Sequence, residues 1–262
     1  MGSTRVISID VGMRNLALSV ISHASAKDEP PKVELWDVVD LSAYALSKNV
    51  CVDEWVVSCS SGWNHRERCA YLVRCGVYAH DEKYNADDSK RALARRIREL
   101  KKSNASLANT LYATTRSLTC YLDETVLSQY STDAIVAIEN QPCMKNPTMK
   151  SVQVAIFTYF VIRGFTRVHF VNANKKLVYA RWCMENNNVT DLKTRTEHTP
   201  GKSLAKKEAI AACTYILEHL PHIVHVSNAH VTRFSDTRKK DDLSDCLLQG
   251  LYVIDRERGH FT

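Results

Sequence analysis

Four acidic side chains lie where the surrounding sequence is apolar. Asp10 and Glu139 each end a run typical of a buried strand, whereas Asp242 and Asp245 lie three residues apart at the start of an apolar helix. Residues three or four apart share a helix face, so Asp241 is an alternative to Asp242. Taken singly, each acid has a structural explanation, because acids often end strands or occupy the first turn of a helix.

Taken together, the acids predict a metal site. Ligands of α/β sheets bind outside the carboxyl ends of the strands, and a helix packed there adds further carboxylates. Two like charges about 4 Å apart repel by roughly 4 kcal/mol at an effective dielectric constant of 20, so the cluster is unfavourable without cations. All-oxygen ligands favour Mg²⁺ or Mn²⁺ over zinc. A pair of such ions activates water and stabilises the leaving oxygen in phosphodiester hydrolysis.

The elements that must position these acids form an α/β pattern. The expected strands lie at residues 6–10, 16–22, 32–41, 134–139 and 167–171, and the expected helices at 151–163, 203–219 and 240–254. A stripe of leucine and isoleucine at helical spacing also predicts a long helix from about 88 to 127, with a break near Ser103. This order of elements predicts one α/β domain with a mixed central sheet flanked by helices.

Two segments depart from that pattern. Residues 42–88 are irregular and are expected to be an insertion, and residues 186–202 predict an extended polar loop. The insertion contains a possible zinc-binding set: Cys59, Cys69, Cys75 and His80. It has no Cys-x-x-Cys pair, so its spacing is poor for structural zinc, and we favour free thiols. Zinc binding by this set stays open.

The composition narrows the class of protein. The formal net charge is +6, and the stretch KRALARRIRELKK carries seven basic residues against one acid, which fits either a phosphate-binding surface or a solvated helix face. The nine cysteines are an odd number, and the early first strand leaves no room for a leader, so we expect free thiols in a reducing intracellular compartment. No apolar stretch approaches the roughly 20 residues of a membrane span.

Several motifs occur in one order over most of the chain: IDVGMRNLA, IENQP followed by NPTMK, VNANKK, LAKKEA and KKDDLSD. Together they resemble the poxvirus-type Holliday junction resolvases, which are similar to the fungal mitochondrial cruciform-cutting endonucleases and, more distantly, to bacterial RuvC. The resemblance implies an RNase H-like fold. It also implies a homodimeric, metal-dependent endonuclease that makes paired symmetric nicks across four-way DNA junctions, in recombination or in processing branched replication intermediates.

The resemblance also assigns roles to residues. It places the metal-binding acids on Asp10, Glu139, Asp242 and Asp245, with two Mg²⁺ ions per site that Mn²⁺ can replace. A functional lysine of the family matches Lys206 or Lys207, and would hold the scissile phosphate or position the attacking water. Further DNA contacts are expected from basic residues elsewhere: Arg95, Arg96, Lys101, Lys102 and Lys202. The compartment implied is a site of viral DNA replication, with mitochondria left open by the fungal relatives.

Two other kinds of function stay open. Another RNase H-like nuclease, such as one that cuts RNA–DNA hybrids, would use the same acids. A nucleotide-binding module of the actin and sugar-kinase type also begins with a strand followed by Asp-x-Gly. The chain is short for two lobes of that type, and it contains no second phosphate loop that we recognise.

Overall fold

The computed structural model describes residues 3–12, 14–24, 29–48, 62–74, 85–102, 107–141, 147–189 and 203–261. The chain divides into two compact units. The sheet unit consists of residues 1–39 and 130–262, and the helical unit consists of residues 40–129. The prediction of one domain with an insertion at 42–88 stays a prediction; the helical unit begins near the start of that segment and continues beyond its end.

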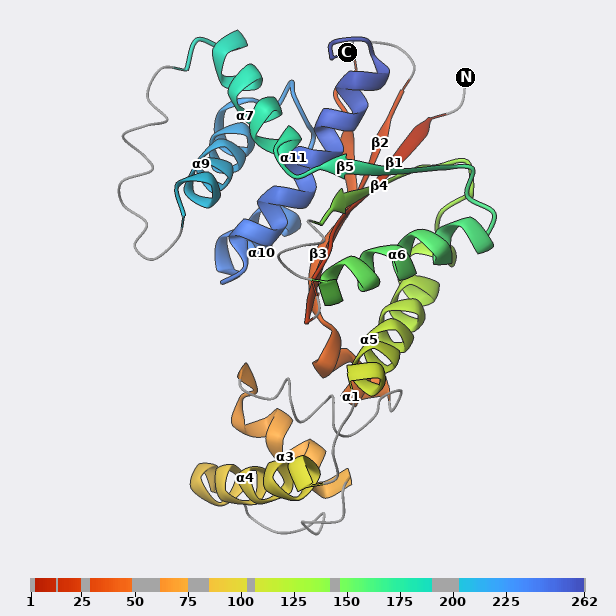
Figure 1. Cartoon of the computed structure of the whole chain (residues 1–262). Helices are drawn as coiled ribbons and strands as arrows, with labels where there is room; N and C mark the ends of the chain where they lie inside the picture. The colour runs from red at the N-terminus through yellow and green to blue at the C-terminus, as the bar shows by residue number, and fades with distance from the viewer. Residues whose placement is uncertain are drawn as a thin grey trace. The chain divides into compact units, whose positions relative to one another are not determined.

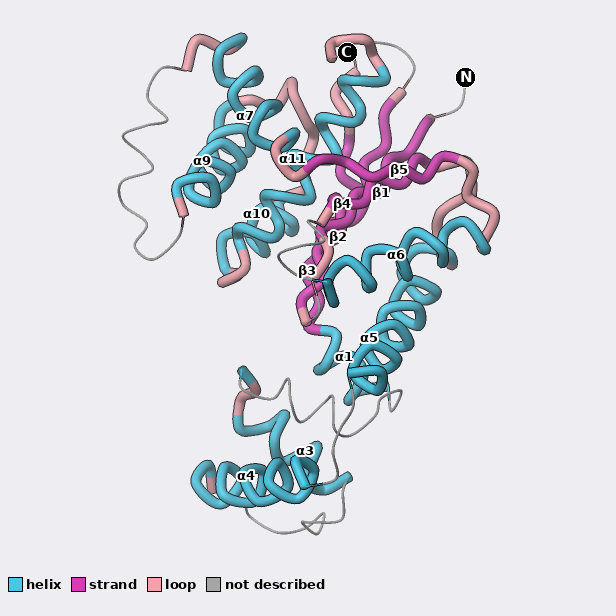
Figure 2. The backbone as a smooth tube through the Cα atoms, viewed as in Figure 1, coloured by secondary structure: helices cyan, strands magenta, loops and turns pink. Residues whose placement is uncertain are grey.

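The sheet unit contains a mixed five-stranded sheet in the order β3-β2-β1-β4-β5 (Figures 1 and 2). Its strands are β1 (Thr4–Asp10), β2 (Asn15–His23), β3 (Lys32–Asp40), β4 (Ile135–Asn140) and β5 (Arg167–Asn172). β1 pairs antiparallel with β2 and parallel with β4, which pairs parallel with β5. The predicted strands and the mixed central sheet are therefore confirmed.

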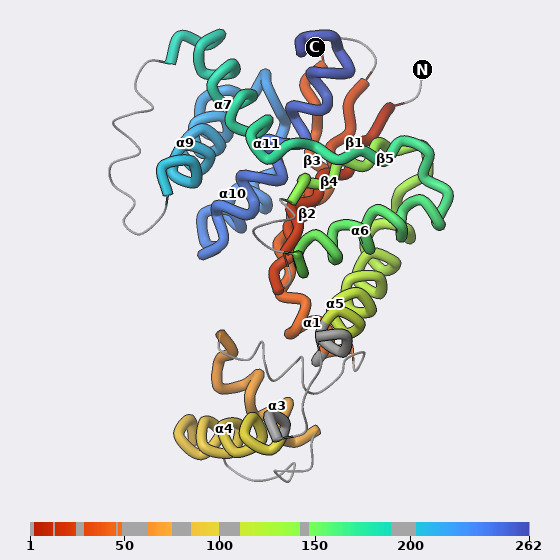
Figure 3. The backbone as a smooth tube through the Cα atoms, in the orientation of Figure 1, coloured from red at the N-terminus to blue at the C-terminus, as the bar shows by residue number. Residues whose placement is uncertain are grey.

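The helices of the sheet unit cover both faces of the sheet. They are α6 (Pro147–Ile162), α7 (Lys175–Asn186), α9 (Leu204–His219), α10 (Asn228–Asp236) and α11 (Lys240–Glu257). α11 packs on β1, β2 and β4 and contacts α7 and α9, whereas α6 packs on β4 and β5. Figure 3 shows α7, α9, α10 and α11 gathered on one side of the sheet and α6 on the other.

Burial explains why the central strands read as continuous apolar runs. Residues 6–9 of β1 and residues 135–138 of β4 have no exposed surface. Strands covered by helices on both faces lack the alternation of half-exposed strands. The sequence did not predict α7 or α10. Because α7 packs against both α9 and α11, its sequence does not show a single apolar stripe.

The helical unit contains four helices in its described residues. They are α1 (Leu41–Lys48), α3 (His65–Arg74), α4 (Ala86–Lys102) and α5 (Leu107–Leu122), the last followed by a π-helical turn at Asp123–Leu127. α1 packs on α5 and α3 packs on α4. The prediction of an irregular segment is thus wrong for α1 and α3. The predicted long helix is described as α4 and α5, and residues 103–106 lie outside the described residues.

Among the described residues, every helix is too short or too polar to span a bilayer.

Candidate active site

Two of the predicted acids lie side by side at the carboxyl ends of neighbouring strands. β1 and β4 are parallel, and Ile9 is opposite Ile138, so Asp10 and Glu139 are the next residues along the two strands. Side chains at paired positions of adjacent strands point to the same face of a sheet. Burial and the adjoining Glu139 carboxyl raise the pKa of Asp10 well above its usual range. The structure therefore brings these two carboxyls together.

α11 and α7 complete this cluster. Asp245 of α11 accepts a hydrogen bond from Lys176 Nζ, at the start of α7, and the same nitrogen lies 3.5 Å from Glu139 Oε1. We define the carboxylate cluster as Asp10, Glu139 and Asp245. Two of its members contact the same ammonium group, and Asp10 adjoins Glu139. Three acids against one lysine leave the cluster with excess negative charge.

The pKa values in the cluster follow from burial and from this excess. Burial raises the pKa of Asp245 to about 6, although the Lys176 ammonium acts in the opposite direction. Burial alone would lower the pKa of Lys176, but Asp245, Glu139 and Asp10 outweigh that effect and hold its pKa above the ordinary value. Lys176 therefore stays protonated, while a carboxyl beside it can retain a proton well above the usual range.

Asp241 and Asp242 have different surroundings. Asp241 is only 6% exposed, and its Oδ2 accepts a 2.7 Å hydrogen bond from Lys206 Nζ. Asp242 is half-buried, with its Oδ2 3.5 Å from Lys239 Nζ. The hydrogen bond to Asp241 is the main reason that the pKa of Lys206 is raised. The more buried member of the pair is thus Asp241, and it already has a cationic partner.

A surface hollow adjoins the cluster, and of the two candidate lysines Lys206 lines it and Lys207 does not. Its volume is about 240 Å³, and Lys176, Lys206 and Asp245 line it together with Asn174 and Ser203. Lys207 is half-buried and does not contribute to this lining. The sequence analysis missed Lys176. Its signal was the motif VNANKK, in which two lysines come four and five residues after the end of the expected strand at 167–171.

Buried hydrogen bonds fix α11 on the sheet beneath the cluster. Gln249 Nε2 donates to Ser8 Oγ at 3.0 Å and to the Ala137 carbonyl at 3.1 Å, so one amide bridges β1 and β4. Trp36 Nε1 and Ser19 Oγ donate to α11 carbonyls, each at 3.0 Å. Together these bonds fix the position of the helix that carries Asp245 relative to the strands that end in Asp10 and Glu139.

Close packing adds to this attachment. A Cβ on Gly250 would lie 2.8 Å from Ile21 Cδ1 and 3.2 Å from Ser8 Cβ, closer than side chains normally approach. The absence of a side chain at Gly250 therefore lets α11 approach β1 and β2 closely.

A second network braces the chain just after Glu139. The Gln141 backbone N–H donates to Gln153 Oε1 at 2.9 Å, and Lys150 Nζ donates to the same oxygen at 3.1 Å. Lys150 also donates to Asn140 Oδ1 at 2.9 Å. The side chains of α6 thereby hold the end of β4 and the residue that follows it.

The predicted DNA-binding residues have different local surroundings. Arg95 is exposed, whereas Arg96 is half-buried and donates to Glu99 at 3.4 Å. Lys101 and Lys102 are the last two residues of α4. Lys202 lies outside the described residues. The first four therefore belong to the helical unit and not to the unit that holds the cluster.

Of the four residues in the possible zinc-binding set, the structure describes one, Cys69. Cys69 is a free, half-buried thiol, and its Sγ lies 3.6 Å from His65 Nε2. Cys59, Cys75 and His80 lie outside the described residues. Within the ranges that the structure covers, no three His, Cys, Asp or Glu side chains have an arrangement ready to hold a metal ion. At the carboxylate cluster, Lys176 Nζ contacts Glu139 and Asp245 instead.

Comparison with known proteins locates the fold. The yeast mitochondrial Holliday junction resolvase Ydc2 matches 98% of this chain and 82% of its own, with a TM-score of 0.53 and 10% identity. The sheet unit has an RNase H-like fold. That part of the resemblance is confirmed, because the likeness to this resolvase extends over nearly the whole chain. The fowlpox virus resolvase, solved with a substrate Holliday junction DNA, matches 97% of this chain with a TM-score of 0.42 and 14% identity.

No family model matches the chain. The uncharacterized protein L451 of Acanthamoeba polyphaga mimivirus is 34% identical over 122 residues, which are 46% of this chain. The matched region spans 28% of that relative's length.

Proposed function

We propose that this protein is a metal-dependent endonuclease that resolves four-way DNA junctions. The observation that carries the proposal is the convergence of Asp10, Glu139 and Asp245 from two adjacent strands and a helix. These elements belong to a unit with the RNase H-like fold. A buried group of like charges is unfavourable for stability alone, so a function that uses it is the simpler explanation.

The donor set of the cluster fits hard cations. Its ligands are all carboxylate oxygens, which Mg²⁺ and Mn²⁺ prefer. The single Lys176 ammonium leaves negative charge uncompensated, which favours added cations. We propose Asp10, Glu139, Asp245 and Asp242 as the metal-binding residues. Asp242 is preferred to Asp241 because its contact with Lys239 is 3.5 Å long, whereas Lys206 holds Asp241 at 2.7 Å. Two Mg²⁺ ions, or Mn²⁺ in their place, would supply activation of water and stabilisation of the leaving oxygen.

The lysines have separate roles in this proposal. Lys206, rather than Lys207, would contact the scissile phosphate, because Lys206 lines the same hollow as Asp245. Lys176 would balance the carboxylate charge when no substrate is bound, since its amine pairs with both Glu139 and Asp245. Both assignments depend on ammonium groups that remain protonated at neutral pH.

Mg²⁺-dependent cleavage of a mobile four-way junction, with the nicks mapped on all four strands, tests the function. We expect symmetric nicks on two opposing strands and no cleavage after chelation. A linear duplex and an RNA–DNA hybrid of the same sequence serve as the comparison substrates. Equal cleavage of all three substrates would contradict a junction resolvase and favour a general RNase H-like nuclease.

Paired nicks need two active sites, and the sheet unit offers a surface for a second copy. Val154 and Val161 lie seven residues apart on α6 and are 47% and 48% exposed, and Phe170 of β5 is 42% exposed. Phe157 of α6 stacks on Phe170 with the ring centroids 4.9 Å apart. We propose that this apolar surface is the homodimer interface.

The double substitution Val154→Glu and Val161→Glu tests the dimer. Burying two carboxylates in an apolar interface is unfavourable, so we expect the variant to be a monomer in light scattering and to lose simultaneous nicking of both strands. Val178→Glu is the control, because Val178 is 42% exposed on α7, away from this surface. A double variant that remains dimeric would contradict the proposed interface.

A further inference from the structure

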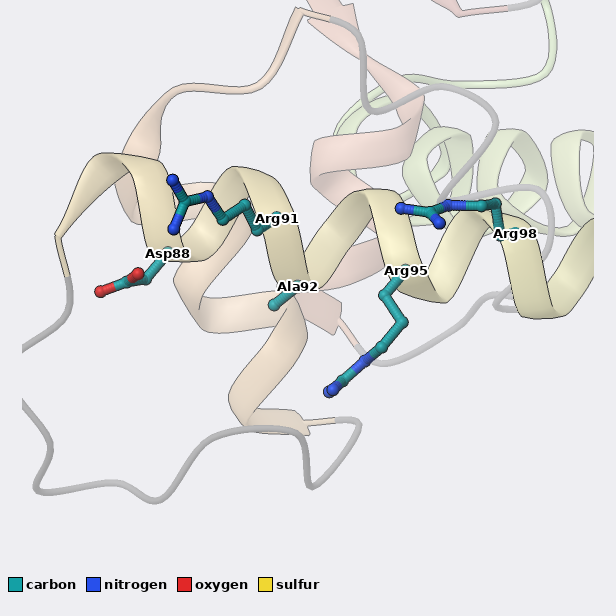
Figure 4. A pocket seen from close by; sticks show the side chains of 5 residues that line it. All are labelled: Asp88, Arg91, Ala92, Arg95 and Arg98. Atoms are coloured by element: carbon teal, nitrogen blue, oxygen red, sulfur yellow. The ribbon is translucent and has the colours of Figure 1, made fainter.

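α4 of the helical unit presents a row of arginines on one face (Figure 4). Arg91, Arg95 and Arg98 are spaced by four and three residues, and all three are exposed. With Asp88 and Ala92 they line a surface hollow of about 480 Å³. The three side chains therefore line one surface hollow, in which the Arg95 guanidinium points to one side of the helix and those of Arg91 and Arg98 to the other (Figure 4).

The opposite face of α4 anchors the helix. Ser89 and Leu93 are buried there and Ile97 is half-buried, and α4 packs against α3. At 100° per residue, Arg91, Arg95 and Arg98 lie on the side opposite to these three residues. The arginine row is thus held by a packed helix and points away from its support.

The three arginines of the row differ from two other basic residues of α4, which form ion pairs with acids of the same helix. Lys90 pairs with Asp87 at 3.7 Å, and Arg96 pairs with Glu99 at 3.4 Å. Among the described residues, no carboxylate oxygen is recorded within 4 Å of the guanidinium nitrogens of Arg91, Arg95 or Arg98. The row accordingly carries positive charge that is available to an external anion.

We propose that the arginine row binds successive phosphates of a nucleic-acid backbone, as a surface separate from the carboxylate cluster. From Arg91 to Arg98 the helix rises by about 10.5 Å. One strand of a duplex carries a phosphate about every 3.4 Å of axis, so the row spans about three phosphate-to-phosphate steps. Guanidinium groups suit this role because their planar forks bind phosphate oxygens in pairs.

The lining of the hollow favours nucleic acid over an acidic protein. Protein interfaces depend on apolar or aromatic anchors in a desolvated centre. Here the lining consists of three arginines, one aspartate and one alanine, and it has no aromatic or large apolar side chain. The inference rests on the proposed function for the identity of the nucleic acid, which would be the duplex arms of the junction. It adds a binding surface in the helical unit that the cleavage site does not require.

The triple variant R91Q/R95Q/R98Q of the full chain tests the proposal. Binding to a four-way junction and to a linear duplex of the same arm sequence is measured by fluorescence anisotropy, in EDTA, over a range of salt concentrations. The slope of log K against log[salt] should fall in magnitude by about 2–3 on both DNAs, at roughly 0.9 for each lost phosphate contact. Binding at low salt should weaken by about tenfold or more.

R167Q/R181Q/R233Q is the matched control. It removes the same charge from three arginines that already pair with acids, namely Glu257, Glu208 and Asp37. Its salt slope should remain that of the wild type. Thermal unfolding of both variants checks the fold, and glutamine retains a helix propensity close to that of arginine.

The possible outcomes separate this inference from the proposed function. An unchanged slope in the α4 variant, an equal loss in the control, or a loss confined to the junction would each overturn the inference. Polyglutamate serves as a model of an acidic protein in the same assay. If the α4 variant lost polyglutamate binding but kept its DNA binding, the partner would be an acidic protein and the inference would be overturned. A wild type that binds both DNAs without cutting, with the slope reduced in the α4 variant, would refute the nuclease and support the arginine row. If the wild type bound neither DNA, the proposal that the arginine row binds phosphates would be refuted.

Discussion

Asp10→Asn is expected to abolish junction cleavage and to leave junction binding intact, and Glu139→Gln should do the same. Each substitution removes one of two adjacent carboxylates that end β1 and β4. Residues that act together in a catalytic group show large losses when any one is removed, so we expect a decrease on the order of 10³-fold or more. Single-turnover cleavage and anisotropy binding measure the two quantities separately.

Asp10→Asn should also stabilise the metal-free protein near pH 8. At pH 8 Asp10 is ionised in the unfolded chain, whereas burial and the adjoining Glu139 disfavour that charge in the folded chain. An uncharged amide removes this cost, which is about 1–3 kcal/mol at an effective dielectric constant near 20. Urea unfolding in the presence of EDTA measures this effect, with Asp133→Asn on the exposed surface as the control. Wild-type cleavage rates in D10N, or an equal stability change in D133N, would contradict the role assigned to the cluster.

The same cluster sets the pH dependence of stability. Burial raises the pKa of Asp245 from 3.8 to about 6 in the folded chain. The folded state then binds a proton more tightly than the unfolded state does, so this contribution to stability is full below about pH 4. It is lost as the pH rises through 6. In EDTA this one group should therefore make the wild type less stable at pH 8 than at pH 5, by about 1.4 kcal/mol. D10N should show a smaller difference.

Gly12→Ala is expected to have the largest effect on folding among substitutions of Gly12, Gly164, Gly250 and Gly259. A Cβ at Gly12 would lie 1.8 Å from the carbonyl oxygen of Asn15 and 2.9 Å from its carbon. Both are backbone atoms, so the contact can be relieved only if the connection between β1 and β2 opens. We expect a loss of about 3 kcal/mol or more in the free energy of unfolding. Cleavage should be lost as well, because Asp10 lies two residues away.

Gly164→Ala provides the comparison for this variant. Gly164 has φ of +87°, and a Cβ there would meet no atom within 4 Å. Its substitution should cost only the backbone strain, about 1 kcal/mol. Urea midpoints of both variants measure the difference, and equal stability of G12A and G164A would show that the turn after Asp10 is not constrained as the structure indicates.

The parts predictable from sequence were those with a local signal. β1 and β4 were identified because buried strands are apolar throughout, and their terminal acids followed directly. α7 was not identified, because it contacts both α9 and α11 and no single apolar face is required. Lys176 was missed with it, although it contacts two of the three clustered acids.

Some of the site also depends on contacts between residues far apart in the chain. The pairing of Lys206 with Asp241 joins positions 35 residues apart, and helical spacing alone could not distinguish Asp241 from Asp242. The bridge from Gln249 to Ser8 joins positions 241 residues apart. A glutamine inside an apolar helix indicates a buried hydrogen bond, but it does not reveal the partner.

The Gln249 bridge has a consequence for how the site can change. One amide is bonded to both strands that end in Asp10 and Glu139, and it lies one helical turn beyond Asp245. These bonds therefore couple the positions of the three carboxylates, because a shift of α11 would break its bonds to both strands. Lys176 contacts Glu139 and Asp245 through a long side chain with several rotatable bonds. Its ammonium can therefore move away from these carboxylates, and back to them, without a change in the backbone.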